Sequence, residues 1–150
     1  MNRPKMQPSL YETDFARWVE QQTQHLQQRN LNAIDWDNIR EEIATLGRSD
    51  RRELENRLEV LLEHLLKRCY ISSRYDNRGW ELTIKEQRKQ LRRLFRASPS
   101  LKTYGEKVLA EIWQDARSDV QDLYPQAAFP VVNPFAEDLD TLLAQMFWDE

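Results

Sequence analysis

Glycine is scarce in this sequence, with only three in 150 residues beside six prolines. Tight β-hairpin turns depend on glycine to supply positive φ angles, so a chain with so few glycines can form few hairpins. We therefore predict an all-α protein. The glycines at positions 47, 79 and 105 also lie too far apart to form the glycine-rich loops that cradle phosphates.

Cysteine occurs once, as Cys69, and no apolar run approaches the roughly 20 residues that cross a bilayer. A single cysteine forms no internal disulfide, which agrees with a reducing compartment, and no CxxC or paired His/Cys spacing suggests zinc. The first ten residues lack the apolar region of a signal peptide. We expect a cytoplasmic protein with no membrane partner, in which Cys69 is a buried apolar residue rather than a nucleophile.

The length and composition of the chain suit one domain. A chain of this size buries about two thirds of its unfolded surface. The 40% apolar fraction is enough for one core, and the 31% charged fraction describes a polar surface. We predict a single all-helical domain over residues 1–150, with a short disordered lead over residues 1–8.

Apolar residues recur at helical spacing in about six segments, which predicts a single-domain bundle of about six helices. The first segment begins near Tyr11 and fades near Asn30, and Asp35 is the expected N-cap of the second. Gly47 is placed to end or interrupt that second helix. The strongest apolar stripe lies near residues 50–70, where we expect the central amphipathic helix. It consists of Leu54, Leu58, Leu61, Leu62, Leu65, Leu66 and Cys69.

Polar residues beside proline mark further boundaries. Residues 72–77 are polar and predict a connection, after which a helix begins at Trp80. Ser98 before Pro99 and Asn133 before Pro134 each match an N-cap followed by proline at the first helical position. These two signals predict the starts of the last two helices.

The residue types that carry most enzyme chemistry are few. His25 lies among glutamines on a polar face. His64 is followed by Leu65 and Arg68, where an HExxH zinc site needs a glutamate and a second histidine. Neither histidine has a glutamate three residues before it, as a di-iron bundle requires. We predict no catalytic residue, no metal site and no cofactor.

The most distinctive pattern is a helix from Trp80 to Arg96 whose cationic and apolar residues fall on different faces. The candidate face for an anion or a partner consists of Lys85, Arg88, Lys89, Arg92, Arg93 and Arg96. Such a stripe suits nucleic-acid phosphates, an anionic ligand or an acidic protein. The simpler alternative is a solvated face whose charges pair with Glu55, Glu59 and Glu63 on the preceding helix. A sequence pI near 5.5 favours this alternative, since it is unusual for a nucleic-acid binder.

Several blocks of the sequence, taken in order, resemble one known family. They are DFARWVEQQ (14–22), IDWDNIREEIATLGRSDRRELENRLEVLLEHLLK (34–67), RGWELTIKEQRKQLRRLF (78–95) and SPSL (98–101). Together they resemble the bacterial family called domain of unknown function twenty-nine, common in cyanobacteria, over about residues 10–143. The resemblance implies an all-helical cytoplasmic domain and carries over no activity, cofactor or catalytic residue. The positions that look like the family's motif are Trp18, Asp35, Trp36, Glu42, Gly47, Arg52, His64, Lys67, Trp80 and Arg88.

Four of these positions hold polar residues near the apolar stripes of three different helices. We predict a polar network in which at least two of the four bond one another, because an unpaired polar group at a core edge costs about 1 to 3 kcal/mol. The members of this candidate network are Glu42, Arg52, His64 and Arg88.

Three functional interpretations follow from these observations. The first is a protein-interaction or scaffold module that binds a protein partner or a second copy of itself through aromatic and apolar anchors. The second is a nucleic-acid-associated accessory protein that uses the basic face. An enzyme with a pocket near His64 ranks below both. The candidate anchors are Trp36, Trp113, Met146, Phe147 and Trp148.

Overall fold

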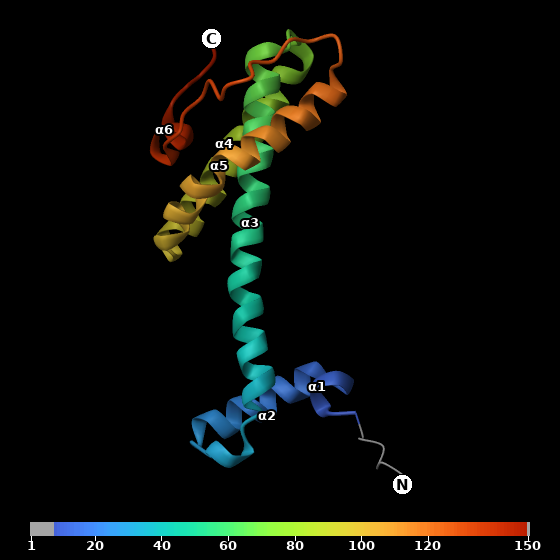
Figure 1. Ribbon diagram of the computed structural model, residues 1–150, viewed down its shortest axis with the longest axis vertical. Coiled ribbons are helices and arrows are strands. Elements are labelled where there is room, and N and C mark those ends of the chain that lie inside the picture. Colours follow the sequence, from blue (N-terminus) through green and yellow to red (C-terminus); the bar gives the residue numbers. More distant parts are fainter. Residues whose placement is uncertain (1–7, 150) are drawn as a thin grey trace. The chain divides into compact units, whose positions relative to one another are not determined.

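The computed structural model describes residues 8–149, and over that range its secondary structure is entirely helical (Figure 1). The all-α prediction and the number of about six helices are confirmed for these residues. In chain order the helices are α1 (Leu10–Thr13), α2 (Phe15–Gln27), the short 3₁₀ helix η1 (Leu31–Ala33), α3 (Trp36–Tyr70), α4 (Arg74–Ala97), α5 (Ser100–Leu123) and α6 (Leu139–Ala144).

The chain divides into two compact units, Met1–Gly47 and Arg48–Glu150. Helix α3 contributes its first turns to the first unit and the remainder to the second. The single-domain expectation stays a prediction, and the predicted disordered lead lies, apart from Pro8, outside the described residues. No helix between residues 8 and 149 is long and apolar enough to cross a membrane.

The first unit is organised around Trp18 and the start of α3. Trp18 and Ile34 are its buried apolar side chains, and Gln22 is buried with them. The indole Nε1 of Trp18 donates to Oδ2 of Asp35 at 3.0 Å, and the backbone N of Asp35 donates to Oε1 of Gln22 at 2.7 Å. The predicted first helix is divided into α1 and α2 at Asp14, which caps α2. These polar contacts tie α2 to the start of α3.

Helix α3 runs without interruption through Gly47, so the predicted helix end at this residue is wrong. A glycine ends a helix when it adopts a positive φ, and Gly47 does not. In the middle of a helix glycine costs only about 1 kcal/mol of helix stability relative to alanine, which is too little to interrupt a long helix. The predicted second and third helices are therefore one helix of 35 residues.

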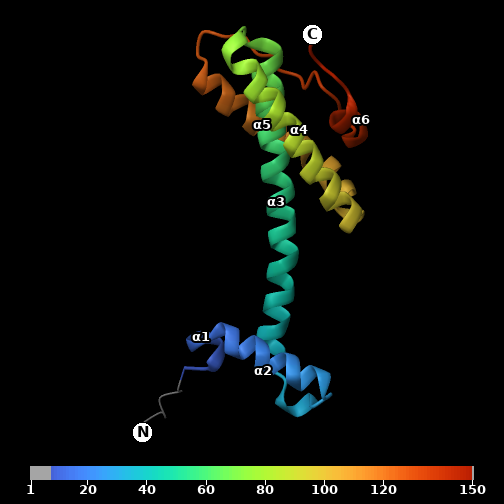
Figure 2. The same cartoon turned by 180° about the vertical axis from the view of Figure 1, so that it is seen from behind.

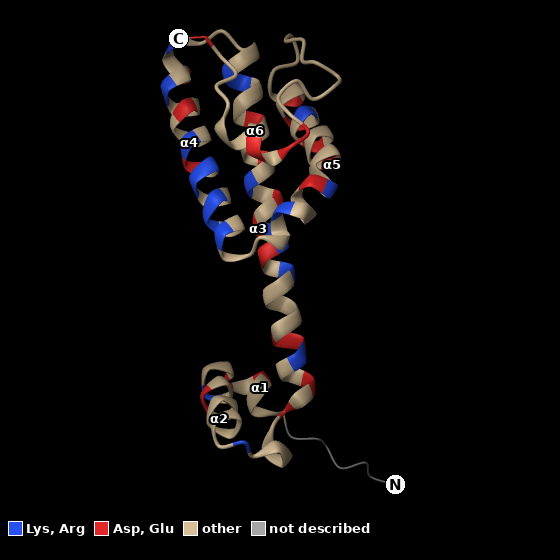
Figure 3. Cartoon of the chain, turned by 90° about the vertical axis from the view of Figure 1, so that its left-hand side faces the viewer, with Lys and Arg blue, Asp and Glu red and all other residues tan. Residues whose placement is uncertain are grey.

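Helix α4 begins at Arg74 rather than at Trp80, so the predicted polar connection over residues 72–77 is mostly helix. Ser73 caps this helix, since its Oγ accepts from the backbone N of Asp76 at 3.2 Å. The signal was present in the sequence, because Ser73 is followed three residues later by an acidic residue that also accepts from the Ser73 hydroxyl at 2.7 Å. Lysines and arginines recur along α4 (Figure 3).

The two predicted serine and asparagine caps are not used as expected. Ser98 ends α4, where its backbone N donates to the Leu94 carbonyl at 2.8 Å, and Pro99 takes the N-cap position of α5. Asn133 forms a turn in which its Oδ1 accepts from the backbone N of Phe135 at 2.9 Å. Helix α6 begins later, after Asp138, which caps it. Asn and Ser stabilise turns as readily as helix starts, which is why the sequence pattern misplaced both boundaries.

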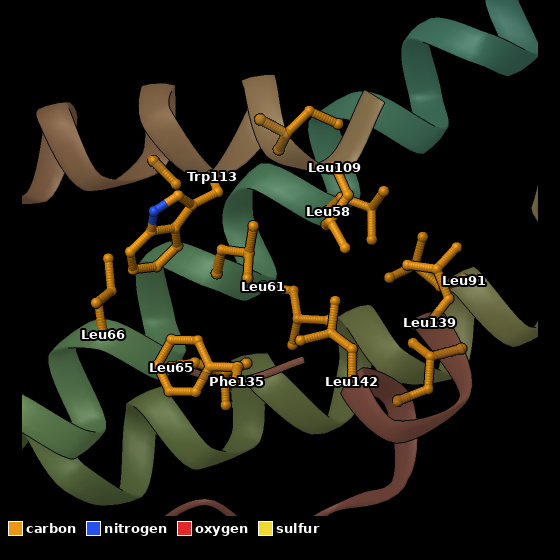
Figure 4. Packing of buried hydrophobic residues seen from close by; sticks show 14 of the residues in the cluster. Leu58, Leu61, Leu65, Leu66, Leu91, Leu109, Trp113, Phe135, Leu139 and Leu142 are labelled. Atoms are coloured by element: carbon orange, nitrogen blue, oxygen red, sulfur yellow. The ribbon is translucent and has the colours of Figure 1, made fainter. Parts of the chain in front are cut away.

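The second unit packs around the latter part of α3, as predicted. Helix α5 crosses in front of this part in Figure 1, and α4 crosses in front of it in Figure 2, so the two flank it. Six fully buried leucines of α3 fill the space between them, and residues of α5, α6 and the connecting segment complete the core (Figure 4). These leucines are Leu54, Leu58, Leu61, Leu62, Leu65 and Leu66.

Candidate functional site

Two residues of the predicted basic face hold helix α6 in place. The guanidinium of Arg88 donates from Nε to the Leu142 carbonyl at 3.1 Å and from Nη2 to the Gln145 carbonyl at 2.6 Å. Arg92 donates from Nη2 to the Leu143 carbonyl. The last carbonyls of a helix have no partner within the helix and carry partial negative charge, so cations are favourable there. Arg88 and Arg92 therefore cap the C-terminus of α6.

The chain after α6 packs against arginines of α3 and α4. The guanidinium carbon of Arg88 lies 5.9 Å from the ring centroid of Phe147, and that of Arg68 lies 5.4 Å from the ring centroid of Trp148. Arg68 also pairs with Glu81 of α4 at 2.8 Å. Burial lowers the pKa of Arg88, and the nearby charge of Arg92 lowers it further. The arginines thus fix the segment after α6 against α3 and α4.

The other four cations of the basic face have no carboxylate within ion-pair distance in the described part of the chain. They are Lys85, Lys89, Arg93 and Arg96, and all four are exposed. The predicted pairing with α3 is absent between residues 8 and 149, because those carboxylates face α5. Glu55 accepts from the Tyr104 hydroxyl, while Glu59 and Glu63 lie against Asp119.

The basic face borders two hollows in the second unit. One, of about 310 Å³, is lined by Arg78, Lys85, Arg88 and Arg92, with Met146 and Trp148 among its apolar walls. The other, of about 570 Å³, is lined by Arg92, Arg96, Lys102 and Phe95. Arg92 and Ala144 line both. Lys89 and Arg93 line neither hollow. The structure therefore divides the predicted basic face into four cations that line a hollow and two that do not.

Three of the four residues of the predicted polar network bond elsewhere, and the fourth, Arg52, is exposed. Glu42 accepts from the Tyr11 hydroxyl in the first unit. His64 lies on α3 with its Nδ1 2.8 Å from the Val60 carbonyl, and burial lowers its pKa. Arg88 caps α6. No hydrogen bond joins two of these four side chains in the described residues, so the predicted mutual bonding is wrong.

Three carboxylates meet between α3 and α5, and the sequence analysis did not predict this cluster. One oxygen from each of Glu59, Glu63 and Asp119 lies within 4.8 Å of the others. Burial, together with the hydrogen bond to Asp119 and the charge of Glu63, raises the pKa of Glu59 to about 7. Carboxylate oxygens of this kind could hold a divalent cation. The spacing of Glu59 and Glu63 places them on one face of α3, but only the packing of α5 brings Asp119 to them.

The predicted anchors fall into three groups. Trp113 is buried, with its Nε1 donating to the Val131 carbonyl at 3.1 Å, so it is a core residue and not an exposed anchor. Trp36 is 54% exposed and Met146 is 58% exposed. Phe147 and Trp148 are partly buried against the core of the second unit. Two further exposed apolar residues, Ile43 and Leu46, lie on α3 in the first unit.

Comparison with known families identifies the chain. The family model described as "Domain of unknown function DUF29" matches residues 10–148, nearly the whole length. The chain therefore belongs to this family. No curated protein and no solved structure matches it.

Proposed function

We propose that this member of the DUF29 family is a protein-interaction module, and that its first unit binds an apolar face of a helix in another protein. The observation that supports the proposal is a row of exposed apolar side chains at the start of α3. Trp36 is 54% exposed, Ile43 65% and Leu46 68%. Single exposed apolar residues are common on protein surfaces, but a contiguous row is typical of a contact site.

These residues lie on one side of the helix. Together with the partly buried Ile39, they follow spacings of three, four and three residues, which is the pattern of a seam that packs against another helix. Helical stripes of this kind are normally covered by a neighbouring element. A partner helix would bury this row, and the burial of its apolar surface would stabilise the complex.

The charge of the first unit specifies the partner further. Residues 8–47 contain seven Asp/Glu and three Arg. Asp37 and Glu41 are exposed on α3 near the apolar row. A partner helix with lysine or arginine beside its apolar stripe complements this surface, whereas a second copy of the same unit would bring acidic residues together. We therefore propose a basic amphipathic helix of another protein, in the cytoplasm.

Site-specific photo-cross-linking in cells tests this proposal. A photoreactive residue at Leu46 is expected to form one discrete adduct, and mass spectrometry of the adduct then identifies the attached peptide. A matched probe at Leu123 on α5, 65% exposed, is expected to form no such adduct. A basic helical peptide from another protein would support the proposal. A cross-link to a second copy, or equal diffuse labelling at both positions, would overturn it.

A pair of substitutions provides the affinity measurement once the peptide is identified. Ile43→Gln with Leu46→Gln is expected to weaken binding of that peptide at least tenfold, since the two side chains lose their burial in the complex. Glutamine is a good helix former, so the helix itself should persist. Leu123→Gln is the control and is expected to leave the dissociation constant unchanged within about twofold.

A further inference from the structure

The two hollows beside α4 together form a surface with the properties of a polyanion site. We call it the α4 groove, defined by its cations Arg78, Lys85, Arg88, Arg92, Arg96 and Lys102. The two hollows share Arg92 and Ala144 in their linings, so they lie next to each other along the helix. It lies in the second unit and is independent of the apolar row in the first.

The charge of the α4 groove is not balanced by its acidic residues. Glu81 lines the first hollow but pairs with Arg68, and Asp140 lines the second but pairs with Lys102 at 2.7 Å. The other five cations of the groove have no carboxylate within ion-pair distance among the described residues. A concave surface whose cations outnumber its carboxylates attracts anions.

The spacing of the cations suits a linear ligand better than a compact one. Lys85, Arg88, Arg92 and Arg96 follow one another at three or four residues. At a rise of about 1.5 Å per residue they are separated by about 5 to 6 Å along the helix axis. Arg78 and Arg96 lie about 27 Å apart on the same basis. A chain with a regular repeat of negative charges can contact several of these residues at once.

Aromatic side chains indicate which linear polyanion fits. Trp148 lines the first hollow and Phe95 the second. Proteins that bind single-stranded nucleic acid combine a cationic groove, which follows the phosphates, with aromatic rings on which bases stack. An acidic peptide would use the charges but would gain nothing comparable from the rings. We propose that the α4 groove binds single-stranded nucleic acid.

Fluorescence anisotropy with a labelled oligothymidylate tests this proposal on the full-length protein. Lys85→Gln with Arg96→Gln removes two groove cations that make no described bond within the protein. Lys89→Gln with Arg93→Gln is the matched control, because it removes the same two residue types from the same helix outside the groove. The groove pair is expected to weaken binding about tenfold, and the control pair by no more than about twofold.

The salt dependence distinguishes phosphate contacts from stacking. For single strands the slope of log affinity against log salt concentration is about −0.7 per phosphate neutralised. Loss of the two phosphate contacts made by Lys85 and Arg96 should therefore reduce the magnitude of this slope by about 1.4. Trp148→Leu is expected to weaken binding about fivefold without changing the slope.

Each alternative outcome has a defined meaning. Absence of oligothymidylate binding at low salt would overturn the proposal. Equal losses for the two charge pairs would also overturn it, since they would show diffuse attraction rather than a groove. Equally tight binding of a polyglutamate peptide of the same net charge would assign the groove to an acidic protein instead. Urea unfolding of every variant checks that the fold is retained.

Discussion

The Nε atom of Arg88 donates a hydrogen bond to the carbonyl oxygen of Leu142 at 3.1 Å, although these residues lie 54 positions apart in the sequence. This bond joins the centre of the basic stripe on α4 to the end of α6. A residue that the sequence placed on a binding face is thereby also a structural cap. Variants of Arg88 therefore report on folding and not on ligand binding alone.

Removal of the Arg88 guanidinium should destabilise the second unit. Arg88→Met keeps an apolar stem of similar length but leaves the Leu142 and Gln145 carbonyls without their donors. We expect the free energy of unfolding to fall by about 2 kcal/mol, since bonds from charged donors contribute about 1.5 to 3 kcal/mol. Urea unfolding followed by circular dichroism measures it. The exposed neighbour Lys89 provides the control: Lys89→Met should change the value by less than about 0.5 kcal/mol, and equal losses would refute the cap.

The stability of the protein should fall between about pH 4.5 and pH 7 because of Glu59. In the folded state its pKa is raised from 4.5 to about 7, first by burial and then by the hydrogen bond to Asp119. The folded state therefore retains a proton that the unfolded state has already lost, and this stabilisation disappears as the pH rises through the folded pKa.

Glu59→Gln tests this effect. The variant should be more stable than the unmodified protein above pH 7, by about 1 kcal/mol after allowance for solvent screening, and no more stable at pH 4.5. Thermal unfolding across this pH range measures the difference. Glu111→Gln, at an exposed carboxyl of α5, is the control for the substitution itself. A pH-independent difference for Glu59→Gln would show that its carboxyl is not perturbed.

Two glycines should respond oppositely to alanine. A Cβ at Gly105 would lie 2.9 Å from Cδ1 of Leu139 and 3.5 Å from Cδ2 of Leu54, and both leucines are fully buried. Gly105→Ala should therefore destabilise the protein by about 1 to 2 kcal/mol. A Cβ added at Gly79 would have no atom within 4 Å, so Gly79→Ala should stabilise α4 by about 0.5 to 1 kcal/mol. Chemical denaturation of both variants checks the signs, and a stabilising effect of Gly105→Ala would contradict the packing around Gly105.

The indole of Trp18 should keep the carboxyl of Asp35 acidic. The pKa of Asp35 is lowered first by the hydrogen bond from Asn38 and further by the bond from Trp18. The resulting stability is fully present above the ordinary pKa of 3.8 and is lost as the pH falls through the lower folded value. Trp18→Phe should raise the pKa of Asp35 toward 3.8 and move acid unfolding of the first unit to higher pH.

A carboxyl titration by NMR measures the Asp35 pKa in both proteins. Trp36→Phe is the matched control, because the Trp36 indole donates to the Leu31 carbonyl at 3.2 Å and not to Asp35. This control should leave the titration unchanged. An equal shift in both variants would assign the effect to a general loosening of the first unit.

The buried stripe of α3 could be predicted because a run of leucines at helical spacing has one stable outcome, which is burial against other helices. The helix boundaries were less predictable. Gly47 lies inside a helix, Ser98 ends one instead of starting one, and Asn133 forms a turn. Each of these residues has more than one favourable local conformation, and the surrounding structure selects among them.

The charged residues show the same limit more strongly. Spacing placed Arg88 and Arg92 on one face of a helix, but nothing local indicated that α6 would end beside them. The meeting of Asp119 with Glu59 was equally invisible, since it requires α5 to pack on α3 in one particular register. Long-range partners of polar side chains are set by how helices pack, and the sequence pattern of one helix does not contain that information.

By itself, the sequence determined the helical class, the leucines of the central core and the cationic character of α4, because each depends on residue type and helical period alone. The tertiary structure decided which cations cap α6 and which line the α4 groove. The physical reason is that hydrophobic burial is non-directional and can be read from periodicity, whereas hydrogen bonds and ion pairs are short-ranged and directional. Their partners exist only once distant segments have packed together.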